Sequence, residues 1–208
     1  VERDEMWDLV DPNEQDARDS MKARKLWETV LETRYRTGEP YLNFIDTANR
    51  ALPQTMKDKG LKINGSNLCN EIHLPTNDDR TAVCCLSSVN LEKFDEWERT
   101  PMIRDLIRFL DNVLRFFIEN AGDEISRARF SATQERSLGL GAMGWHSYLH
   151  KNRIPFESDT AVVKNIKIFD HIKSEAVAET LHLGSVLDEC PDMEGTGHRN
   201  SHLLAIAP

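Results

Sequence analysis

The stretch NGSNLCNEIHL, residues 64–74, places an amide, a thiol and a carboxylate at every second position, as Asn67, Cys69 and Glu71. On a helix, Asn67 and Glu71 would share a face and Cys69 would point away from it. In an extended segment all three side chains would lie on one face. A glycine shortly before the trio and a proline after it favour an extended segment or a loop. We therefore predict a non-helical segment on which the three groups converge.

The trio allows two interpretations. Free cysteine is among the most buried residue types, so Cys69 can be a small core residue with Glu71 exposed to solvent. Alternatively the three groups form a reaction centre. A nucleophilic thiolate needs a nearby cation, whereas Glu71 would oppose a negative charge on the sulfur. A carboxylate beside a thiol therefore favours chemistry in which the sulfur stays neutral, such as hydrogen-atom transfer.

The chain has four cysteines, which are Cys69, Cys84, Cys85 and Cys190. Its sequence contains no signal-peptide pattern. This usage predicts free thiols in a reducing compartment, the cytoplasm. Neither the cysteine spacing nor the histidine spacing matches a zinc site, so no metal site is predicted. Cys84 and Cys85 are neighbours in a predicted strand and would face opposite sides. One of them is a candidate redox thiol that looks toward Cys69, and the other is a core residue.

Composition limits the partners. The net charge of the 208 residues is −9, and the lysines and arginines are scattered rather than concentrated, which argues against nucleic acid. No apolar run approaches the ~18 residues of a membrane span, so no membrane partner is expected. The chain begins without methionine and ends in an apolar run. We therefore expect residues 1–208 to be a central segment of a longer polypeptide, without a separate second domain.

Hydrophobic periodicity and turn residues predict the secondary structure. The predicted helices cover residues 11–36, 101–120, 133–151 and 159–183, and the predicted strands cover residues 40–46, 81–91 and 201–207. Residues 49–66 and 190–200 are predicted loops, and residues 75–80 a turn. Helices that alternate with strands buried on both faces indicate an α/β fold with a largely parallel sheet or barrel.

The stretch GLGAMG, residues 139–144, matches the pattern G-x-G-x-x-G. A dinucleotide site requires a hydrophobic strand directly before the first glycine and a helix after it. The preceding residues, SATQERSL, are polar and compatible with a helix. We therefore interpret these glycines as allowing a helix to pack closely, and a dinucleotide-binding oxidoreductase remains an alternative.

The sequence also resembles a known family. SNLCNEI, residues 66–72, followed by AVCCLSSVNL, residues 82–91, closely resembles the active-site segment of the large, catalytic subunit of class I ribonucleotide reductase. The resemblance continues through TGEPYLNFID, RSLGLGAMGWHSYL and the terminal RNSHLLAIAP, in matching order. It implies a fold: part of a ten-stranded α/β barrel, with Cys69 on a central finger loop.

The resemblance implies residue roles at matching positions. Cys69 takes the place of the cysteine whose thiyl radical removes the 3′ hydrogen of the ribose. Glu71 matches the carboxylate that accepts the 3′-hydroxyl proton, and Asn67 matches the amide that binds the substrate. Cys84 matches one member of the redox dithiol that reduces the 2′ carbon, and the other member would lie upstream of this chain. Cys85 falls on a variable position.

The resemblance further implies the reduction of ribonucleoside diphosphates to 2′-deoxyribonucleotides for DNA synthesis. No cofactor is expected to bind this segment directly. A metal-containing small subunit would supply the radical, thioredoxin or glutaredoxin would act as reductant, and ATP or dNTP effectors would bind outside this segment. The other partners expected are the remaining segments of the large subunit and a second large subunit in a homodimer. The alternatives are a cobalamin- or glycyl-radical-dependent barrel enzyme and an inactive scaffold fragment.

Overall fold

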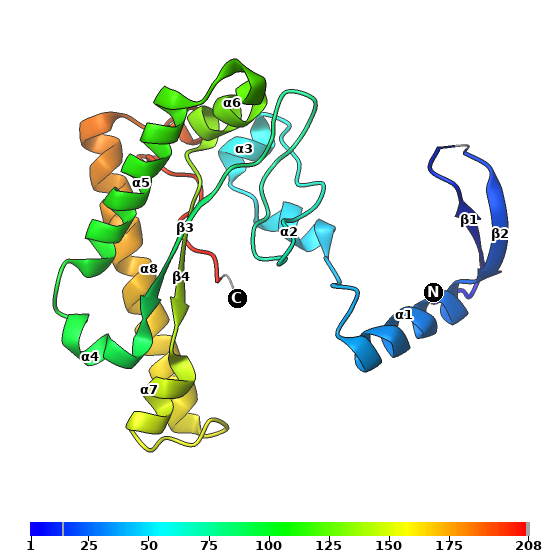
Figure 1. The fold of residues 1–208 in the computed structure, drawn as a ribbon, viewed down its shortest axis with the longest axis horizontal. Helices are drawn as coiled ribbons and strands as arrows, with labels where there is room; N and C mark the ends of the chain where they lie inside the picture. Colours follow the sequence, from blue (N-terminus) through cyan, green and yellow to red (C-terminus); the bar gives the residue numbers. More distant parts are fainter. Residues whose placement is uncertain (14, 207–208) are drawn as a thin grey trace. The chain divides into compact units, whose positions relative to one another are not determined.

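The computed structural model describes residues 1–13 and 15–206. The chain divides into two compact units, Val1–Asn43 and Phe44–Pro208, and each is described by itself. Figure 1 labels the helices and strands of both units. None of the helices in the described part of the chain is both long enough and apolar enough to cross a membrane.

The first unit consists of a β-hairpin followed by a helix. Strands β1 (Met6–Val10) and β2 (Ala17–Lys22) pair antiparallel, and α1 spans Ala23–Thr37. Gly38 ends α1 with a φ of 81°, as its position predicted. The predicted helix over residues 11–36 is thus wrong before residue 23. The reason is turn chemistry between the strands, where the backbone N–H of Asn13 donates to the Asp11 carboxylate at 2.8 Å.

The second unit is built around two parallel strands, β3 (Cys85–Asn90) and β4 (Leu138–Met143). Helices α5 (Met102–Asn120) and α8 (Asp159–Leu187) lie beside them (Figure 1). Both helices match their predictions, and the hydroxyl of Ser158 caps α8 by accepting the Ala161 N–H at 3.2 Å. The core contains the buried apolar stripe of α5, which consists of Ile103, Ile107, Leu110 and Leu114.

Shorter elements complete the second unit. They are α2 (Ile45–Ala51), α3 (Gln54–Asp58), α4 (Phe94–Trp97), α6 (Ser126–Glu135) and α7 (Trp145–Lys151), with single 3₁₀ turns at Leu91–Lys93, Asp123–Ile125 and Pro191–Met193. The turn predicted within residues 75–80 is present, where Asn77 and Arg80 exchange backbone hydrogen bonds.

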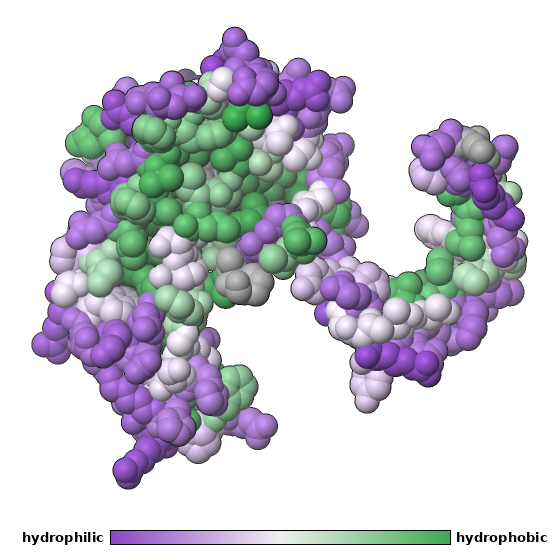
Figure 2. Space-filling view, viewed as in Figure 1, coloured by the Kyte–Doolittle hydropathy of each residue, from purple (hydrophilic) through white to green (hydrophobic). Residues whose placement is uncertain are grey.

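The second unit also exposes apolar side chains on α5, which belong to Phe109, Val113 and Phe116. Figure 2 shows apolar surface over the region of α5 and β3. The apolar residues of α5 therefore extend beyond the stripe that faces the core.

Two predictions at the start of this unit are wrong. Residues 40–46 do not form a strand, because the chain enters α2 at Ile45, and α3 lies inside the predicted loop. A tertiary contact organises this region: the side chain of Asn49 accepts from the Ile63 N–H at 2.9 Å and donates to the Ile63 carbonyl at 2.8 Å. Leu52, Met56 and Ile63 form a small core around it.

The predicted helix over residues 133–151 is also wrong. The helix α6 ends at Glu135, because Arg136 adopts a left-handed conformation with a φ of 43°. The glycine-rich stretch that follows forms β4 and pairs with β3. A dinucleotide site would need these glycines in a turn that leads into a helix, so the dinucleotide interpretation does not fit.

Residues 202–205 run parallel to β4, along the edge of β4 that β3 leaves free. The N–H of Leu138 donates to the His202 carbonyl at 2.9 Å, and the N–H of Ala205 donates to the Leu140 carbonyl at 3.1 Å. The prediction of a strand over residues 201–207 is wrong for the described residues 201–206, which carry only an isolated parallel bridge between Leu204 and Leu140, and residue 207 lies outside the described range. The α/β class and the parallel pairing are confirmed, and the strands of the described residues do not close into a barrel.

Candidate active site

The segment that carries the trio is a tight turn. The side-chain oxygen of Asn67 accepts from the backbone N–H of Glu71 at 3.1 Å and of Ile72 at 2.9 Å. The N–H of Asn70 donates to the Asn67 carbonyl at 3.1 Å, and Asn70 has a φ of 64°. Asparagine tolerates this left-handed conformation better than most residues. The prediction of a non-helical segment is confirmed.

The prediction that the trio lines one face of an extended segment is wrong. The left-handed Asn70 turns the chain between Cys69 and Glu71, which breaks the alternation of side chains. Cys69 is exposed, whereas Glu71 is partly buried, and its Oε2 atom is buried without a hydrogen-bond partner among the described residues. The thiol is therefore not sealed in a pocket in this structure.

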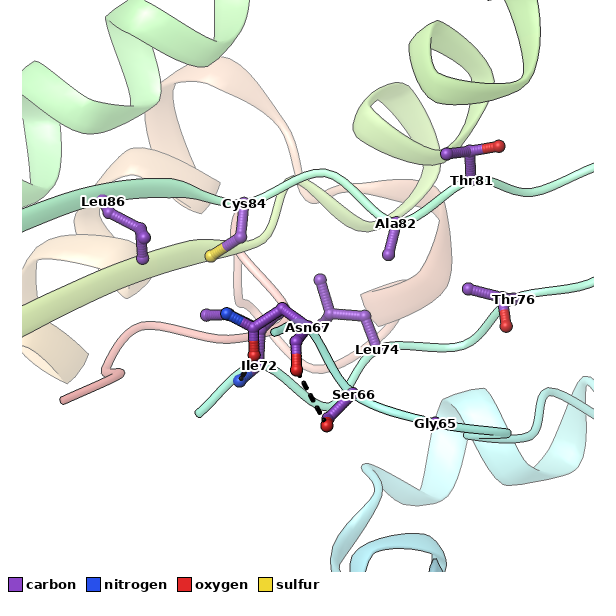
Figure 3. Close-up of a pocket in the computed structure, with 10 residues that line it drawn as sticks. All are labelled: Gly65, Ser66, Asn67, Ile72, Leu74, Thr76, Thr81, Ala82, Cys84 and Leu86. Carbon is purple, nitrogen blue, oxygen red and sulfur yellow. Dashed lines mark hydrogen bonds between the residues drawn. The ribbon is translucent and has the colours of Figure 1, made fainter. Parts of the chain in front are cut away.

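A pocket of about 440 Å³ lies between this turn and the segment that leads into β3. Its lining consists of Gly65, Ser66, Asn67, Ile72, Leu74, Thr76, Thr81, Ala82, Cys84 and Leu86. Figure 3 shows Asn67 and Ile72 on one wall, with Cys84 and Leu86 on the other. The structure thus brings Asn67 and Cys84 to one cavity, whereas Cys69 and Glu71 are not part of its lining.

The vicinal cysteines divide as predicted. The side chain of Cys84 lines the pocket, and Cys85 packs against the hydrophobic core. In the described part of the chain all four cysteines are free thiols, as their pattern predicted.

The surroundings of Cys84 keep its thiol protonated. Burial raises the pKa of Cys84 to about 12, and the charges of Cys85, Glu135 and Glu71 add to this effect. A hydrogen bond from the Ser137 hydroxyl to the Cys84 sulfur, at 3.6 Å, acts in the opposite direction. At neutral pH the sulfur is therefore a neutral S–H group, suited to giving up a hydrogen atom rather than to nucleophilic attack.

Sequence reasoning missed Glu135, which is fully buried at the end of α6. Neither of its carboxylate oxygens has a hydrogen-bond partner among the residues that the structure describes. Burial raises the pKa of Glu135 to about 8, with Arg80 lowering it and Asp192 raising it further. The carboxyl is thus mostly protonated at neutral pH. Its polar, helix-compatible sequence context gave no signal of this burial.

Sequence reasoning also missed a second buried cluster, which is centred on Asp111 of α5 and holds Arg136, Arg199 and Asn200. Asp111 on α5 accepts from Arg136 at 2.9 Å, from Arg199 at 2.9 Å and from the side-chain amide of Asn200 at 2.8 Å. Burial alone would raise the pKa of Asp111, but these charged and neutral donors outweigh burial and hold it below its ordinary value. The cluster ties α5 to Arg136, which lies just before β4, and to Arg199 and Asn200, which lie just before the residues that pair with β4.

Within residues 1–13 and 15–206, no group of three or more His, Cys, Asp or Glu side chains is arranged to bind a metal ion.

Known proteins resemble this chain over most of its length. The family model described as "Ribonucleotide reductase, barrel domain" matches residues 1–207. The putative ribonucleoside-diphosphate reductase large subunit of Frog virus 3 (isolate Goorha) is 59% identical over 211 residues, which cover 100% of this chain and 37% of that protein. The large chain of Schizosaccharomyces pombe is 30% identical over 220 residues, covering 94% of this chain and 27% of that protein.

A solved structure agrees with these relatives. The class Id ribonucleotide reductase alpha subunit of Actinobacillus ureae matches with a TM-score of 0.85 and 43% identity, over 89% of this chain and 36% of that subunit. The chain thus spans roughly a third of the length of such relatives. On the sequence match and the shared fold together, the chain belongs to the ribonucleotide reductase barrel-domain family.

Proposed function

We propose that this chain forms part of the catalytic barrel of a class I ribonucleotide reductase large subunit, in which ribonucleoside diphosphates are reduced to 2′-deoxyribonucleotides by radical chemistry. The observation that carries the proposal is the pocket where the Asn67 turn and Cys84 meet, in a chain that matches the family from residue 1 to 207. Segments outside this chain would complete a ten-stranded barrel, and the chain alone is expected to be inactive.

In this proposal Cys69 carries the reacting sulfur on the finger loop. Its thiyl radical removes the 3′ hydrogen atom of the ribose, which forms an S–H bond and leaves a carbon radical. The two bonds are similar in strength, so the transfer is nearly balanced. Exposure of the Cys69 side chain is compatible with access by a substrate.

Glu71 is proposed as the general base. It accepts the proton of the 3′-hydroxyl while the 2′-hydroxyl takes a proton from a reducing thiol and leaves as water. The buried Oε2 atom, which has no hydrogen-bond partner among the described residues, is available for this proton. The side-chain oxygen of Asn67 is occupied by two backbone N–H groups, so its amide nitrogen is the group that donates to the substrate.

Cys84 is proposed as one of two reducing thiols. Two S–H groups supply two protons and two electrons: one proton leaves with the 2′-hydroxyl as water, the other hydrogen ends on the 2′ carbon, and the two sulfurs form a disulfide. A neutral thiol is the form that this step requires, which agrees with the burial of Cys84. The second thiol would come from a segment upstream of this chain.

The assembly would include further partners. Similarity to a protein named an alpha subunit supports a second kind of subunit, and we propose that a metal-containing small subunit supplies the radical. We also propose pairing of large subunits in a homodimer, thioredoxin or glutaredoxin as the source of electrons, and effector nucleotides bound outside this segment. A thiol cycle of this kind requires a reducing compartment, the cytoplasm.

The test is turnover of the assembled large and small subunits with three matched variants, Cys69→Ala, Cys84→Ala and Cys85→Ala. We expect the first two to abolish the formation of deoxyribonucleotide. The third removes a thiol that faces the core, and it should leave turnover near the wild-type rate. Wild-type turnover in the Cys69→Ala enzyme would refute the proposal.

A further inference from the structure

We propose that Ser137 and Gly139, at the start of the glycine-rich stretch, position the sulfur of Cys84 in the pocket. Gly139 leaves the space that the sulfur occupies, and the Ser137 hydroxyl holds the sulfur there. The inference rests on the proposed role of Cys84 and deepens it. It also explains a glycine of the stretch GLGAMG, which does not form a dinucleotide site in this structure.

Strand β4 approaches Cys84 closely at Gly139, which leaves no room for a side chain at this residue. A Cβ atom added to Gly139 would lie 3.0 Å from the Cys84 sulfur and 3.0 Å from Ala205 Cβ, and it would overlap a methyl group of Leu86. Both Cys84 and Leu86 line the pocket, so a methyl group at residue 139 would displace the pocket wall. The φ of Gly139 lies outside the left-handed region, so the position requires glycine for its small size.

One hydrogen bond, from a residue on the same face as Gly139, holds the sulfur of Cys84. Ser137 is fully buried, and its hydroxyl donates to the Cys84 sulfur at 3.6 Å, a normal length for a bond to sulfur. Residues two apart in an extended chain face the same side. The hydroxyl of Ser137 and the missing side chain of Gly139 therefore act on the same sulfur from one face of the segment.

The Ser137 hydrogen bond affects the pKa of Cys84, which can be measured. Glu135 at the end of α6, Glu71 in the turn and Cys85 on β3 all raise the pKa of Cys84, as burial does. The Ser137 bond is the contribution that lowers it. Removing the hydroxyl should therefore make the thiol ionise at higher pH and react more slowly with an alkylating agent at a fixed pH.

The experiment measures alkylation of Cys84 by iodoacetamide as a function of pH in the full chain, with tandem mass spectrometry to separate Cys84 from Cys85. We expect Ser137→Ala to slow the reaction about fivefold, the effect of losing one modest hydrogen bond. Ser137→Thr keeps the hydroxyl and should restore the rate. Ser131→Ala is the matched control, because Ser131 is equally buried and its hydroxyl has no partner among the described residues.

Gly139→Ala tests, through a double-variant cycle, whether residue 139 must leave room for the Cys84 sulfur. If the added methyl group displaces the sulfur, the Ser137 hydrogen bond is already broken in Gly139→Ala. Adding Ser137→Ala to that variant should then change the alkylation rate of Cys84 by less than twofold. Gly65→Ala is the control for the thiol profile, because a Cβ there meets nothing within 4 Å, although Gly65 also borders the pocket. Circular dichroism checks that each variant is folded.

Three results would overturn the inference: an unchanged pH profile in Ser137→Ala, no rescue by threonine, or additive effects of the two substitutions. In the assembled enzyme we expect Ser137→Ala to lower kcat and leave KM unchanged, since the substrate contacts remain, and Gly139→Ala, which displaces the pocket wall, to lower kcat as well. A wild-type kcat in both would also contradict the inference. The alkylation experiment needs no turnover, so it can succeed even if Cys84→Ala retains activity and the proposed function fails.

Discussion

Replacing Glu135 by glutamine should stabilise the protein at alkaline pH and change little at pH 5. The carboxyl is fully buried without a hydrogen-bond partner among the described residues, and burial raises its pKa from 4.5 to about 8. Between these two pH values the folded chain binds a proton that the unfolded chain has lost. The wild type therefore loses stability as the pH rises through this window. Glutamine is similar in shape and stays neutral, so the variant escapes this loss.

The size of the effect follows from the two pKa values. Each pH unit between them is worth about 1.4 kcal/mol, so the wild type should lose roughly 4 kcal/mol relative to the variant between pH 5 and pH 9. A typical urea dependence of about 2 kcal/mol per molar converts this into a relative shift of about 2 M in the unfolding midpoint.

The assay is urea unfolding followed by circular dichroism, for the wild type and Glu135→Gln, at pH 5 and pH 9. Glu119→Gln is the matched control: Glu119 is an exposed carboxylate of α5 that pairs with Arg115 at the surface. The same measurements on this control show how replacing a carboxylate at the surface affects stability at each pH. Parallel pH dependences of the wild type and Glu135→Gln would refute the reasoning, because they would mean that Glu135 ionises alike in both states.

The remaining predictions concern the packing that holds the site. Asp111→Asn should lower the free energy of unfolding, measured with urea at pH 7, by about 3–5 kcal/mol, because Arg136 and Arg199 stay buried without their counter-charge. A decrease no larger than that caused by removing an exposed ion pair would contradict this prediction. Ile107 is fully buried, so Ile107→Ala should lower the free energy of unfolding, measured by thermal unfolding, by about 2–5 kcal/mol. An unchanged unfolding midpoint would contradict the placement of Ile107 in the core. Ser158→Ala should lower the free energy of unfolding, measured with urea, by about 1 kcal/mol, because the N-terminal cap of α8 is lost. An unchanged free energy would mean that the hydrogen bond to the Ala161 N–H does not stabilise the protein.

Long elements with a regular apolar pattern were predictable from the sequence. Helix α5 carries its buried side chains at helical spacing, and α8 begins at a capping serine, so both follow from local rules. Strand β4 could not be predicted this way, because its neighbours are far away in the sequence. It pairs with β3, whose residue Cys85 lies opposite Leu138, and with residues 202–205. Non-local pairing outweighed the local preference of that stretch for helix.

The candidate site shows the same division. Successive side chains of a strand alternate between its two faces, and this rule was enough to predict that Cys84 and Cys85 face opposite sides. The geometry of the trio was not predictable by alternation, because one left-handed residue, Asn70, redirects the chain. Glu135 was missed for another reason: its burial depends on segments far away in the sequence, such as the 3₁₀ turn at Pro191–Met193 that contacts α6, and the sequence pattern placed Glu135 inside one helix over residues 133–151.

The most direct test of the central claim is a crystal structure of the assembled large subunit with a bound ribonucleoside diphosphate. The account predicts the ribose against the Asn67 turn, with its C3′ atom about 3.5 Å from the Cys69 sulfur, the separation of a reactive complex. It also predicts the 3′-hydroxyl at hydrogen-bond distance from Glu71 and the 2′ carbon facing Cys84. A ribose bound out of reach of the Cys69 sulfur would contradict the account.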